Sequence, residues 1–411
     1  MYLAATRAAD HAAARGTSRP GRVPGTVVAL GIVSLVTDIS SEMVTAILPL
    51  YLVFGLGLNP LQFGLLDGLY AGATAVLRLV GGHVADRWQR LKAVAGIGYA
   101  TSAVAKLGFL AAGSSVPAIG VVLALDRAGK GVRTAPRDAL ISLSSSPETL
   151  GRSFGVHRAM DTVGAFLGPL AATLVLWAAL GNYDAVFVTS FSLATCAVLL
   201  LVVLVPNRTR LTAEPVKHKP SPRAMLGLLR EASFRRCCIW AAALGLFTVT
   251  DAFVYLALQR RWDVDGRLFP LLPLGTAGVF LLLAIPLGRL GDRIGRWKVF
   301  IGGHLALVVA LLLLCGPIGN WWLALALHGA FYAATDGVLP AAAGPMLPEN
   351  LRASGLAVLQ TGQALARMVS AVTVGLLWTL WDVRPALLLF TAALLTVTVA
   401  AAVVKPLEAA R

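Results

Sequence analysis

The sequence contains few charged residues and few cysteines for its length. Charged side chains make up 13% of its 411 residues, whereas a soluble globular domain carries about 25%. This low charge argues against water as the solvent for most of the surface. The four cysteines show neither metal-ligand spacing nor a disulfide framework, so we interpret them as small apolar core residues.

Sequence patterns typical of other protein classes are also missing. The sequence contains no Walker-type phosphate loop, which argues against transport driven by ATP. His157 and Asp161 could ligate a metal from one helix face, but no third or fourth ligand is near them in the sequence. No nucleophile with a partner base is evident. We therefore predict that the chain is not an enzyme and binds neither a metal nor another cofactor.

Long apolar runs dominate the sequence, in which 57% of the residues are hydrophobic. Runs of about 20 residues recur, and each can cross a hydrocarbon core of about 30 Å. We predict an all-α membrane protein with twelve transmembrane helices. These are expected near residues 27–53, 61–82, 93–112, 116–138, 153–178, 185–205, 236–258, 268–289, 298–316, 320–343, 353–378 and 385–404.

The basic residues predict how the chain is oriented in the membrane. The net charge is +15, but the Lys and Arg residues lie in short loops between apolar runs rather than on one soluble face. This pattern excludes nucleic acid as a partner and predicts that both termini face the cytoplasm of an inner cell membrane. The expected parts are a tail at 1–25, a six-helix bundle at 26–205, a basic linker at 206–235 on anionic headgroups, a second bundle at 236–404 and a tail at 405–411.

Three pairs of matching segments divide the chain into two related halves. Thr37-Asp38 in the first range matches Thr250-Asp251 in the seventh. The loops after the second and eighth ranges both read G-x-x-x-D-R-x-x-R-x-K. The matched positions are Gly82, Asp86, Arg87 and Arg90 in the first copy, and Gly288, Asp292, Arg293 and Arg296 in the second. The fifth and eleventh ranges are both preceded by Pro-Glu, followed by Arg152 and Arg352. Such repeats are typical of secondary transporters.

The duplicated loop resembles the signature of the major facilitator superfamily. The resemblance covers the whole chain in topology. It implies two pseudo-symmetric six-helix bundles around a central cavity, which rock to expose a small-molecule substrate to each side in turn. It also implies a monomer in the lipid bilayer.

The conserved spacing within the loops suggests two latches at the cytoplasmic side. We expect Gly82 and Gly288 to let neighbouring helices approach closely. Asp86 is expected to accept hydrogen bonds at the start of the eleventh range, and Asp292 at the start of the fifth. Under the alternative interpretation, the loops only supply positive charge that sets topology.

Ionisable residues inside the apolar ranges are candidates for proton coupling and substrate binding, because each costs several kcal/mol in lipid unless it is paired or hydrated. The set comprises Asp38, Glu42, Asp126, Arg127, Lys130, His157, Arg158, Asp161, Asp251, Asp336 and Arg367. Asp38 is the preferred proton carrier, since it lies near mid-bilayer and has no partner adjacent in its own helix. His157 could relay a proton to Asp161. His83, His304 and His328 are expected to be packing residues. The alternative is that the set forms ion pairs that fix helix register, Asp126 with Lys130 and Asp161 with Arg158.

The direction of transport is indicated by a motif in the fifth range. Gly164, Gly168 and Pro169 form G-x-x-x-G-P, which resembles the antiporter motif of drug/proton exchangers. The segment Arg127–Gly131 resembles a second family motif, with Lys130 where glutamine is usual. The resemblance favours proton-driven efflux of a small organic compound. Two alternatives stay open: proton-coupled uptake of an anion, such as an organic acid, a phosphorylated compound or a siderophore, and a transporter-like sensor without flux.

Overall fold

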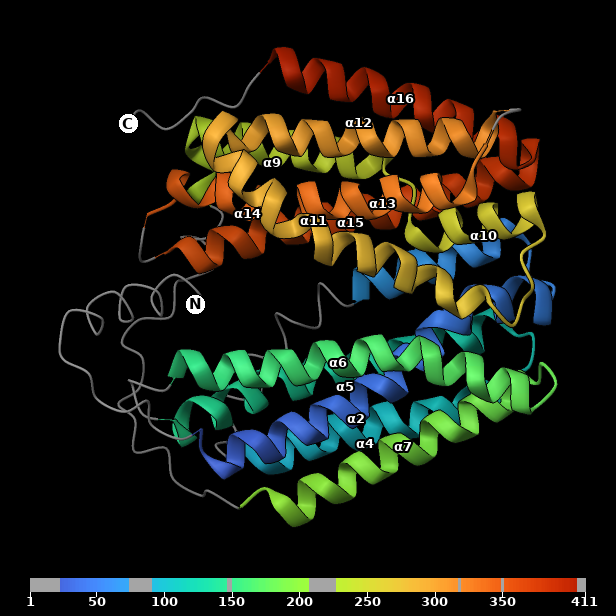
Figure 1. Ribbon diagram of the computed structural model, residues 1–411, viewed down its shortest axis with the longest axis vertical. Helices are drawn as coiled ribbons and strands as arrows, with labels where there is room; N and C mark the ends of the chain where they lie inside the picture. Colours follow the sequence, from blue (N-terminus) through green and yellow to red (C-terminus); the bar gives the residue numbers. More distant parts are fainter. Residues whose placement is uncertain are drawn as a thin grey trace. The chain divides into compact units, whose positions relative to one another are not determined.

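The computed structural model describes residues 23–73, 91–145, 150–206, 227–316, 319–348 and 351–404. Throughout these residues the regular structure is helical (Figure 1). A helix satisfies its own backbone hydrogen bonds, which is what a hydrocarbon environment demands. The chain forms two compact units, one of Met1–Leu48 and Val76–Lys217, the other of Pro49–Ala75 and His218–Arg411.

The first unit contains long helices with short connections. They are α2 (Gly25–Leu50), α4 (Leu91–Ala112), α5 (Val116–Ser144), α6 (Leu150–Ala178) and α7 (Tyr183–Leu204). The start of α7 is set by Asn182, whose side chain accepts a hydrogen bond of 2.9 Å from the backbone N–H of Asp184. A core of hydrophobic residues, including Leu30, Tyr99 and Ile141, joins α2, α4, α5 and α7.

The second unit contains the remaining described elements. They are the short π-helix at Tyr51–Gly55, a helix at 60–73, α9 (Ala232–Phe247), α10 (Asp251–Trp262), α11 (Leu272–Ile294), α12 (Arg296–Cys315), α13 (Trp321–Thr335), α14 (Val338–Ala343), α15 (Arg352–Trp381) and α16 (Val383–Val403). Short 3₁₀ turns lie at Leu228–Arg230, Phe269–Leu271 and Gly344–Met346.

The chain passes from one unit to the other in the last turn of α2, between Leu48 and Pro49. The described residues 49–73 belong to the unit of the C-terminal helices. Phe63 lies edge-on to Phe253, with ring centroids 5.0 Å apart, and the N–H of Leu61 donates to Thr379 Oγ1 at 3.0 Å. The domain boundaries predicted from the internal repeat remain a prediction.

Nine helices among the described residues are long and apolar enough to cross a membrane, and the predicted number of twelve stays unconfirmed. The second predicted range is described only to residue 73. In the fourth range, α5 carries several charges in its middle. The tenth range is broken, because α13 has 15 residues and ends at Thr335, before α14. The seventh range is also interrupted, at 248–250, between α9 and α10.

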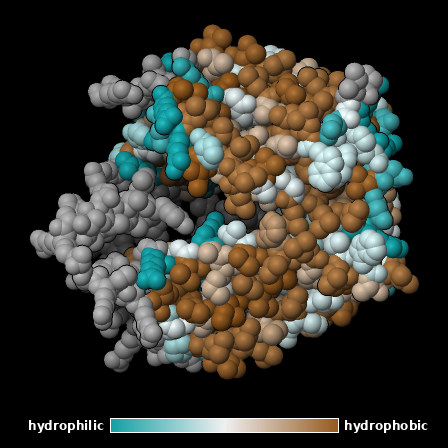
Figure 2. Space-filling view, viewed as in Figure 1, coloured by the Kyte–Doolittle hydropathy of each residue, from teal (hydrophilic) through white to brown (hydrophobic). Residues whose placement is uncertain are grey.

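Large apolar side chains cover the outer faces of the helices. Leu174, Val203 and Leu282 are 71%, 77% and 75% exposed. Figure 2 shows such hydrophobic residues over much of the visible surface, with hydrophilic ones concentrated near helix ends. Exposed apolar side chains on this scale are expected of helices whose solvent is lipid.

Close packing of α4 on α5 depends on two glycines that face each other. A Cβ atom at Gly129 would lie 2.6 Å from the carbonyl oxygen of Gly98 and 2.8 Å from the backbone nitrogen of Ser102. Small residues of this kind let membrane helices approach at backbone distance. Because the neighbouring atoms are backbone, they cannot move aside as a side-chain end can.

We expect Gly129→Ala to destabilise the first unit by about 1–3 kcal/mol, the usual cost of overpacking, and to lower the thermal unfolding midpoint of the protein in detergent. Gly155→Ala on α6 is the matched control, because a Cβ there meets nothing within 4 Å. A Gly129→Ala protein as stable as the Gly155→Ala control would contradict the close approach of α4 and α5.

Candidate functional site

The first unit buries a network of charged side chains between α2, α5 and α6. Arg133 Nη2 lies 3.6 Å from Asp38 Oδ1, and both residues are almost fully buried, at 2% and 8% exposure. The Arg133 guanidinium also stacks over the Tyr99 ring, 4.7 Å from its centroid. The sequence showed that Asp38 has no partner in its own helix; the tertiary fold supplies one from α5. Such a pair is stable in an apolar environment only if its geometry is well satisfied.

Asp161 on α6 is the centre of this network. Its carboxylate accepts a hydrogen bond of 2.6 Å from Ser34 Oγ and lies 3.3 Å from Arg158 Nη1 and 3.8 Å from Arg137 Nη1. The predicted Asp161–Arg158 pair is therefore present. Ser34 and Asp38 are one turn apart on α2, so the carboxyl groups of Asp161 and Asp38 are electrostatic neighbours. Two neighbouring carboxyl groups favour the binding of one proton between them.

Asp126 forms a separate, fully buried cluster between α4 and α5. It accepts hydrogen bonds from Ser102 Oγ at 2.5 Å and from the guanidinium of Arg127, and Lys106 Nζ lies 3.4 Å away. The predicted Asp126–Lys130 pair is wrong, because the Asp126 side chain is turned toward α4. Lys106 was missed, although a lysine inside the apolar range 93–112 was a usable signal.

Lys130 and Glu42 differ from the other charged residues of the network in their pairing. Lys130 is half-buried and in electrostatic reach of Glu42 and Asp38 on α2. Among the described residues neither Lys130 nor Glu42 has an oppositely charged group within 4 Å. This distinguishes Lys130 from Arg127, Arg133 and Arg137 on the same helix, which are all paired.

The small-residue motif of α6 packs against the part of α2 that carries the acidic residues. A Cβ at Gly164 would lie 2.5 Å from the carbonyl oxygen of Leu35, and one at Gly168 would lie 2.6 Å from Glu42 Cβ. The motif therefore allows the carboxylates of α2 and α6 to approach. Pro169 follows inside α6. His157 is buried, and its Nε2 has no hydrogen-bond partner in the described part of the chain, so the relay to Asp161 stays a prediction.

The second unit has its own polar cluster, built on hydroxyl groups and a histidine. Asp251 accepts a hydrogen bond from the Tyr332 hydroxyl and lies 3.3 Å from His328 Nε2. The other ring nitrogen of His328, Nδ1, lies 3.4 Å from Thr276 Oγ1. Thr276 Oγ1 in turn accepts a hydrogen bond of 3.0 Å from the Tyr255 hydroxyl. His328 is fully buried, whereas the Asp251 side chain is 46% exposed. The cluster thus leads from the surface of this unit into its interior.

Only some of the other charged residues of the second unit lie near the Asp251 cluster. Arg367 lies over the Tyr332 ring at 5.9 Å and so joins the Asp251 cluster. Asp336 does not, since it is exposed at the end of α13 and its carboxylate bonds to no described residue. Asp67 was missed by sequence reasoning; it accepts a hydrogen bond of 2.6 Å from Thr250 Oγ1, beside Asp251. An acidic residue inside the apolar range 61–82 was the available signal.

The duplicated loop is described only in its second copy. Gly82, Asp86, Arg87 and Arg90 lie outside the described residues. In the second copy Asp292 accepts from Arg296 at 2.9 Å, while Arg296 also donates to the carbonyl of Ala341 at 2.7 Å. The expectation for Gly288 is wrong for the described part of the chain, where a Cβ at this position would meet no atom within 4 Å. Arg293 is exposed. Both latches, with Arg152 and Arg352, stay predictions.

Within the described residues, no group of three His, Cys, Asp or Glu side chains could hold a metal ion. The ionisable groups instead bind one another, across helices that are otherwise apolar. Buried charges of this kind in membrane helices mark solute and ion pathways. The fold and the clusters together define a multi-pass membrane transporter.

Comparisons with known proteins agree with this class. The sequence profile of the Major Facilitator Superfamily matches residues 30–281 and 252–411. The chain is 30% identical over 369 residues to an uncharacterized MFS-type transporter of Methanocaldococcus jannaschii, covering 86% of this chain and 88% of that protein. It is 27% identical over 356 residues to an uncharacterized protein of Mycobacterium tuberculosis, covering 86% of each chain. The chain belongs to the major facilitator superfamily, and it is a transporter of a small-molecule substrate rather than an enzyme.

Solved structures with the same fold include other transporters. The crystal structure of the nucleoside transporter NupG has a TM-score of 0.77 and 15% identity, over 91% of this chain and 98% of that one. A bacterial homolog of the human lysosomal transporter Spinster, in an inward-facing and unoccupied conformation, has a TM-score of 0.70 and 14% identity, over 92% and 96%. At these identities the likeness concerns the fold alone.

The Asp126 cluster is expected to be structural. Asp126→Asn leaves Lys106 buried without its carboxylate, which should destabilise the protein by about 3–5 kcal/mol. Adding Lys106→Met should recover part of this loss, because the buried ammonium group is removed. Thermal unfolding of the single and double variants in detergent measures both effects. Wild-type stability in Asp126→Asn, with transport lost, would instead assign Asp126 to the transport pathway.

Proposed function

We propose that this protein is a proton-coupled secondary active transporter that works by alternating access and exports a small organic compound in exchange for protons. The observation that carries the proposal is the buried network in which Asp38 on α2 pairs with Arg133, while Ser34 of the same helix donates to Asp161 on α6. A pair of carboxyl groups that shares one proton in a buried site can bind and release that proton as its surroundings change.

Two arginines allow the proton to be released without leaving an unpaired carboxylate. When the shared proton is present, the pair carries one negative charge. When the proton leaves, two carboxylates remain, and Arg133 and Arg137 lie beside Asp38 and Asp161 to neutralise them. The change in repulsion between α2 and α6 would then be the link from protonation to helix movement.

The direction of export is supported by the G-x-x-x-G-P motif of α6, which brings these two helices into contact at Gly164 and Gly168. We further propose that the protein lies in the inner cell membrane with both termini in the cytoplasm, since the loops there carry most of the Lys and Arg residues. The protein is proposed to act as a monomer.

Uptake of an anionic solute is the second candidate function. It is favoured by Lys130, the cation of α5 that has no carboxylate within ion-pair distance among the described residues. An organic acid, a phosphorylated compound or a siderophore could pair with this ammonium group. A sensor without flux would bind the solute in the same way but would not move it.

Proton coupling can be tested in proteoliposomes that contain a pH-sensitive dye, with a panel of organic solutes added outside. The wild type should release protons when its solute is added. Asp38→Asn should lower this proton release at least ten-fold while retaining solute counterflow, because asparagine has the shape of aspartate but cannot exchange a proton. Asp184→Asn, at the exposed start of α7, is the matched control.

Undiminished proton release in Asp38→Asn would end the assignment of the coupling site to this pair. Loss of proton release in Asp251→Asn instead would move the site to the second unit. No solute-dependent proton movement in the wild type would favour a uniporter or a sensor.

Lys130→Gln distinguishes the two candidate functions. If an anion binds to Lys130, the variant should weaken counterflow of anionic solutes by about ten-fold or more, since a buried charge-assisted hydrogen bond is lost. Counterflow of neutral and cationic solutes should stay unchanged. Equal counterflow of an anionic solute by variant and wild type would exclude Lys130 as its binding group.

A further inference from the structure

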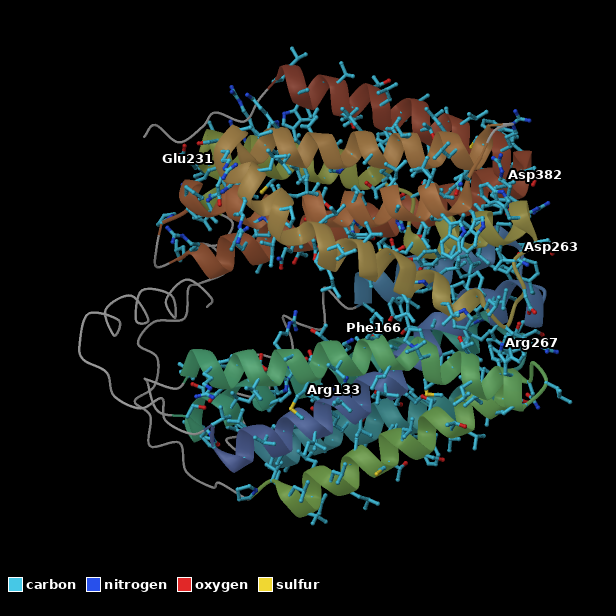
Figure 3. The ribbon with its side chains drawn as sticks, in the orientation of Figure 1. Arg133, Phe166, Glu231, Asp263, Arg267 and Asp382 are labelled. Carbon is cyan, nitrogen blue, oxygen red and sulfur yellow. The ribbon has the colours of Figure 1, made fainter. Side chains whose placement is uncertain are left out.

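The two ends of the second unit differ in their balance of charge. Glu231 lies at the end where α9 and α12 begin and α16 ends, which we call the basic end (Figure 3). The segments 228–236 and 288–298 of this end contain seven basic and two acidic residues. At the opposite end, the segments 259–267 and 382–384 contain four basic and three acidic residues. An anionic partner is therefore attracted to the basic end.

Most cations of the basic end have no carboxylate partner. Asp292 is occupied by Arg296 at 2.9 Å, and Glu231 accepts a hydrogen bond of 3.0 Å from Ser233 Oγ. Within the described ranges, the other basic side chains of these two segments are exposed and have no carboxylate within 4 Å. They are Arg230, Arg235, Arg236, Arg289, Arg293 and Lys298. This leaves positive charge at the surface that a phosphate group can neutralise.

Helix periodicity places Arg236 beside the last turn of α16. Phe247 of α9 packs edge-on to Phe390 of α16, with ring centroids 6.1 Å apart. Arg236 precedes Phe247 by eleven residues, and Ala401 follows Phe390 by the same number, which is close to three full turns in each helix. Because α9 and α16 run in opposite directions (Figure 1), Arg236 and Ala401 lie on facing sides of the two helices, at the basic end.

Trp297 attaches the start of α12 to the same turn of α16. Its indole Nε1 donates a hydrogen bond of 3.0 Å to the carbonyl oxygen of Ala401. Lys298 is the next residue of α12 and is exposed. Arg236 and Lys298 thus belong to two helices that meet the last turn of α16. We propose that these two cations bind the headgroup of an anionic phospholipid, such as phosphatidylglycerol, at the end of α16.

The surface beside the two cations suits the acyl chains of a lipid. Ile239 follows Arg236 by almost one turn of α9, Leu305 follows Lys298 by two turns of α12, and both are exposed apolar residues. Val403 at the end of α16 is exposed as well. Tryptophan side chains are enriched at the level of lipid headgroups, and basic sites at the ends of membrane helices bind anionic headgroups. A soluble phosphate compound would use the charges and leave the apolar surface uncovered.

A lipid bound at this position would fasten the end of α16 to the starts of α9 and α12, all within the second unit. The inference does not depend on proton coupling, because neither Arg236 nor Lys298 belongs to the proposed proton site. The Asp38→Asn test and a test of lipid binding can therefore fail separately.

Native mass spectrometry of the full-length protein in detergent measures lipid binding directly. Phosphatidylglycerol and phosphatidylcholine are titrated in parallel, since the first headgroup is anionic and the second is zwitterionic. The wild type should bind one phosphatidylglycerol molecule at least ten-fold more tightly than phosphatidylcholine. Arg236→Gln and Lys298→Gln should each lower the affinity for phosphatidylglycerol about five-fold, the value of one basic side chain near an anionic surface.

The double variant Arg289→Gln/Arg384→Gln is the matched control. It removes as much charge as Arg236→Gln/Lys298→Gln does, from exposed positions on α11 and at the start of α16. We expect this control to retain the wild-type affinity for phosphatidylglycerol. An excess of glycerol 3-phosphate should not displace the lipid from the wild type, because the apolar surface contributes to lipid binding alone.

Equal affinities of the wild type for the two phospholipids would overturn the proposal, and this comparison requires no variant. An equal loss of affinity in the control and in Arg236→Gln/Lys298→Gln would also overturn it, since the attraction would then depend on total charge rather than on this position. Displacement of the lipid by glycerol 3-phosphate would overturn the assignment to a lipid.

Discussion

The interaction on which the first unit depends is the pairing of charges that lipid cannot solvate. An unpaired charge at membrane depth costs several kcal/mol, so α5, with four cations between Arg127 and Arg137, is compatible with a membrane only through partners on other helices. Asp126 with Lys106 and Arg127 fixes α4 to α5, while Asp38 and Asp161 bring α2 and α6 to the other side of α5. The glycines of α6 and α4 follow from the same requirement, because only small residues allow backbones close enough for such contacts.

The two related halves of the sequence provide different partners for their buried carboxylates. Asp38 and Asp251 occupy matching positions in the repeat. Asp38 lies inside the continuous helix α2 and faces an arginine, whereas Asp251 opens α10 after a break in the helix and faces hydroxyl groups and His328. Thr37 donates to a carbonyl of its own helix, but Thr250 donates to Asp67. The same Thr-Asp pair therefore takes part in an ion pair in one half and in a hydrogen-bonded chain in the other.

Helix positions and the superfamily could be predicted from the sequence, because both depend on local pattern. Apolar run length places a helix within a few residues, and the duplicated loop carries the family resemblance. The ion pairs between charged side chains were predicted less well. Arg158 with Asp161 was found because both lie on one helix face, one turn apart. Lys130 with Asp126 has the same kind of spacing and was wrong, since α4 offered Lys106 and Ser102 to the carboxylate instead.

The sequence by itself determined that this protein lies in a membrane, that it consists of helices arranged as two related halves, and that it belongs to a family of transporters. These properties follow from the composition, from the length of the apolar runs and from the internal repeat, all of which are local features of the sequence. Only the tertiary structure decided that Asp38 pairs with Arg133, that residues 49–73 belong to the unit of the C-terminal helices, and that Trp297 bonds to the last turn of α16. Each of these joins residues far apart in the chain, and the contact depends on how helices pack, which no local pattern specifies.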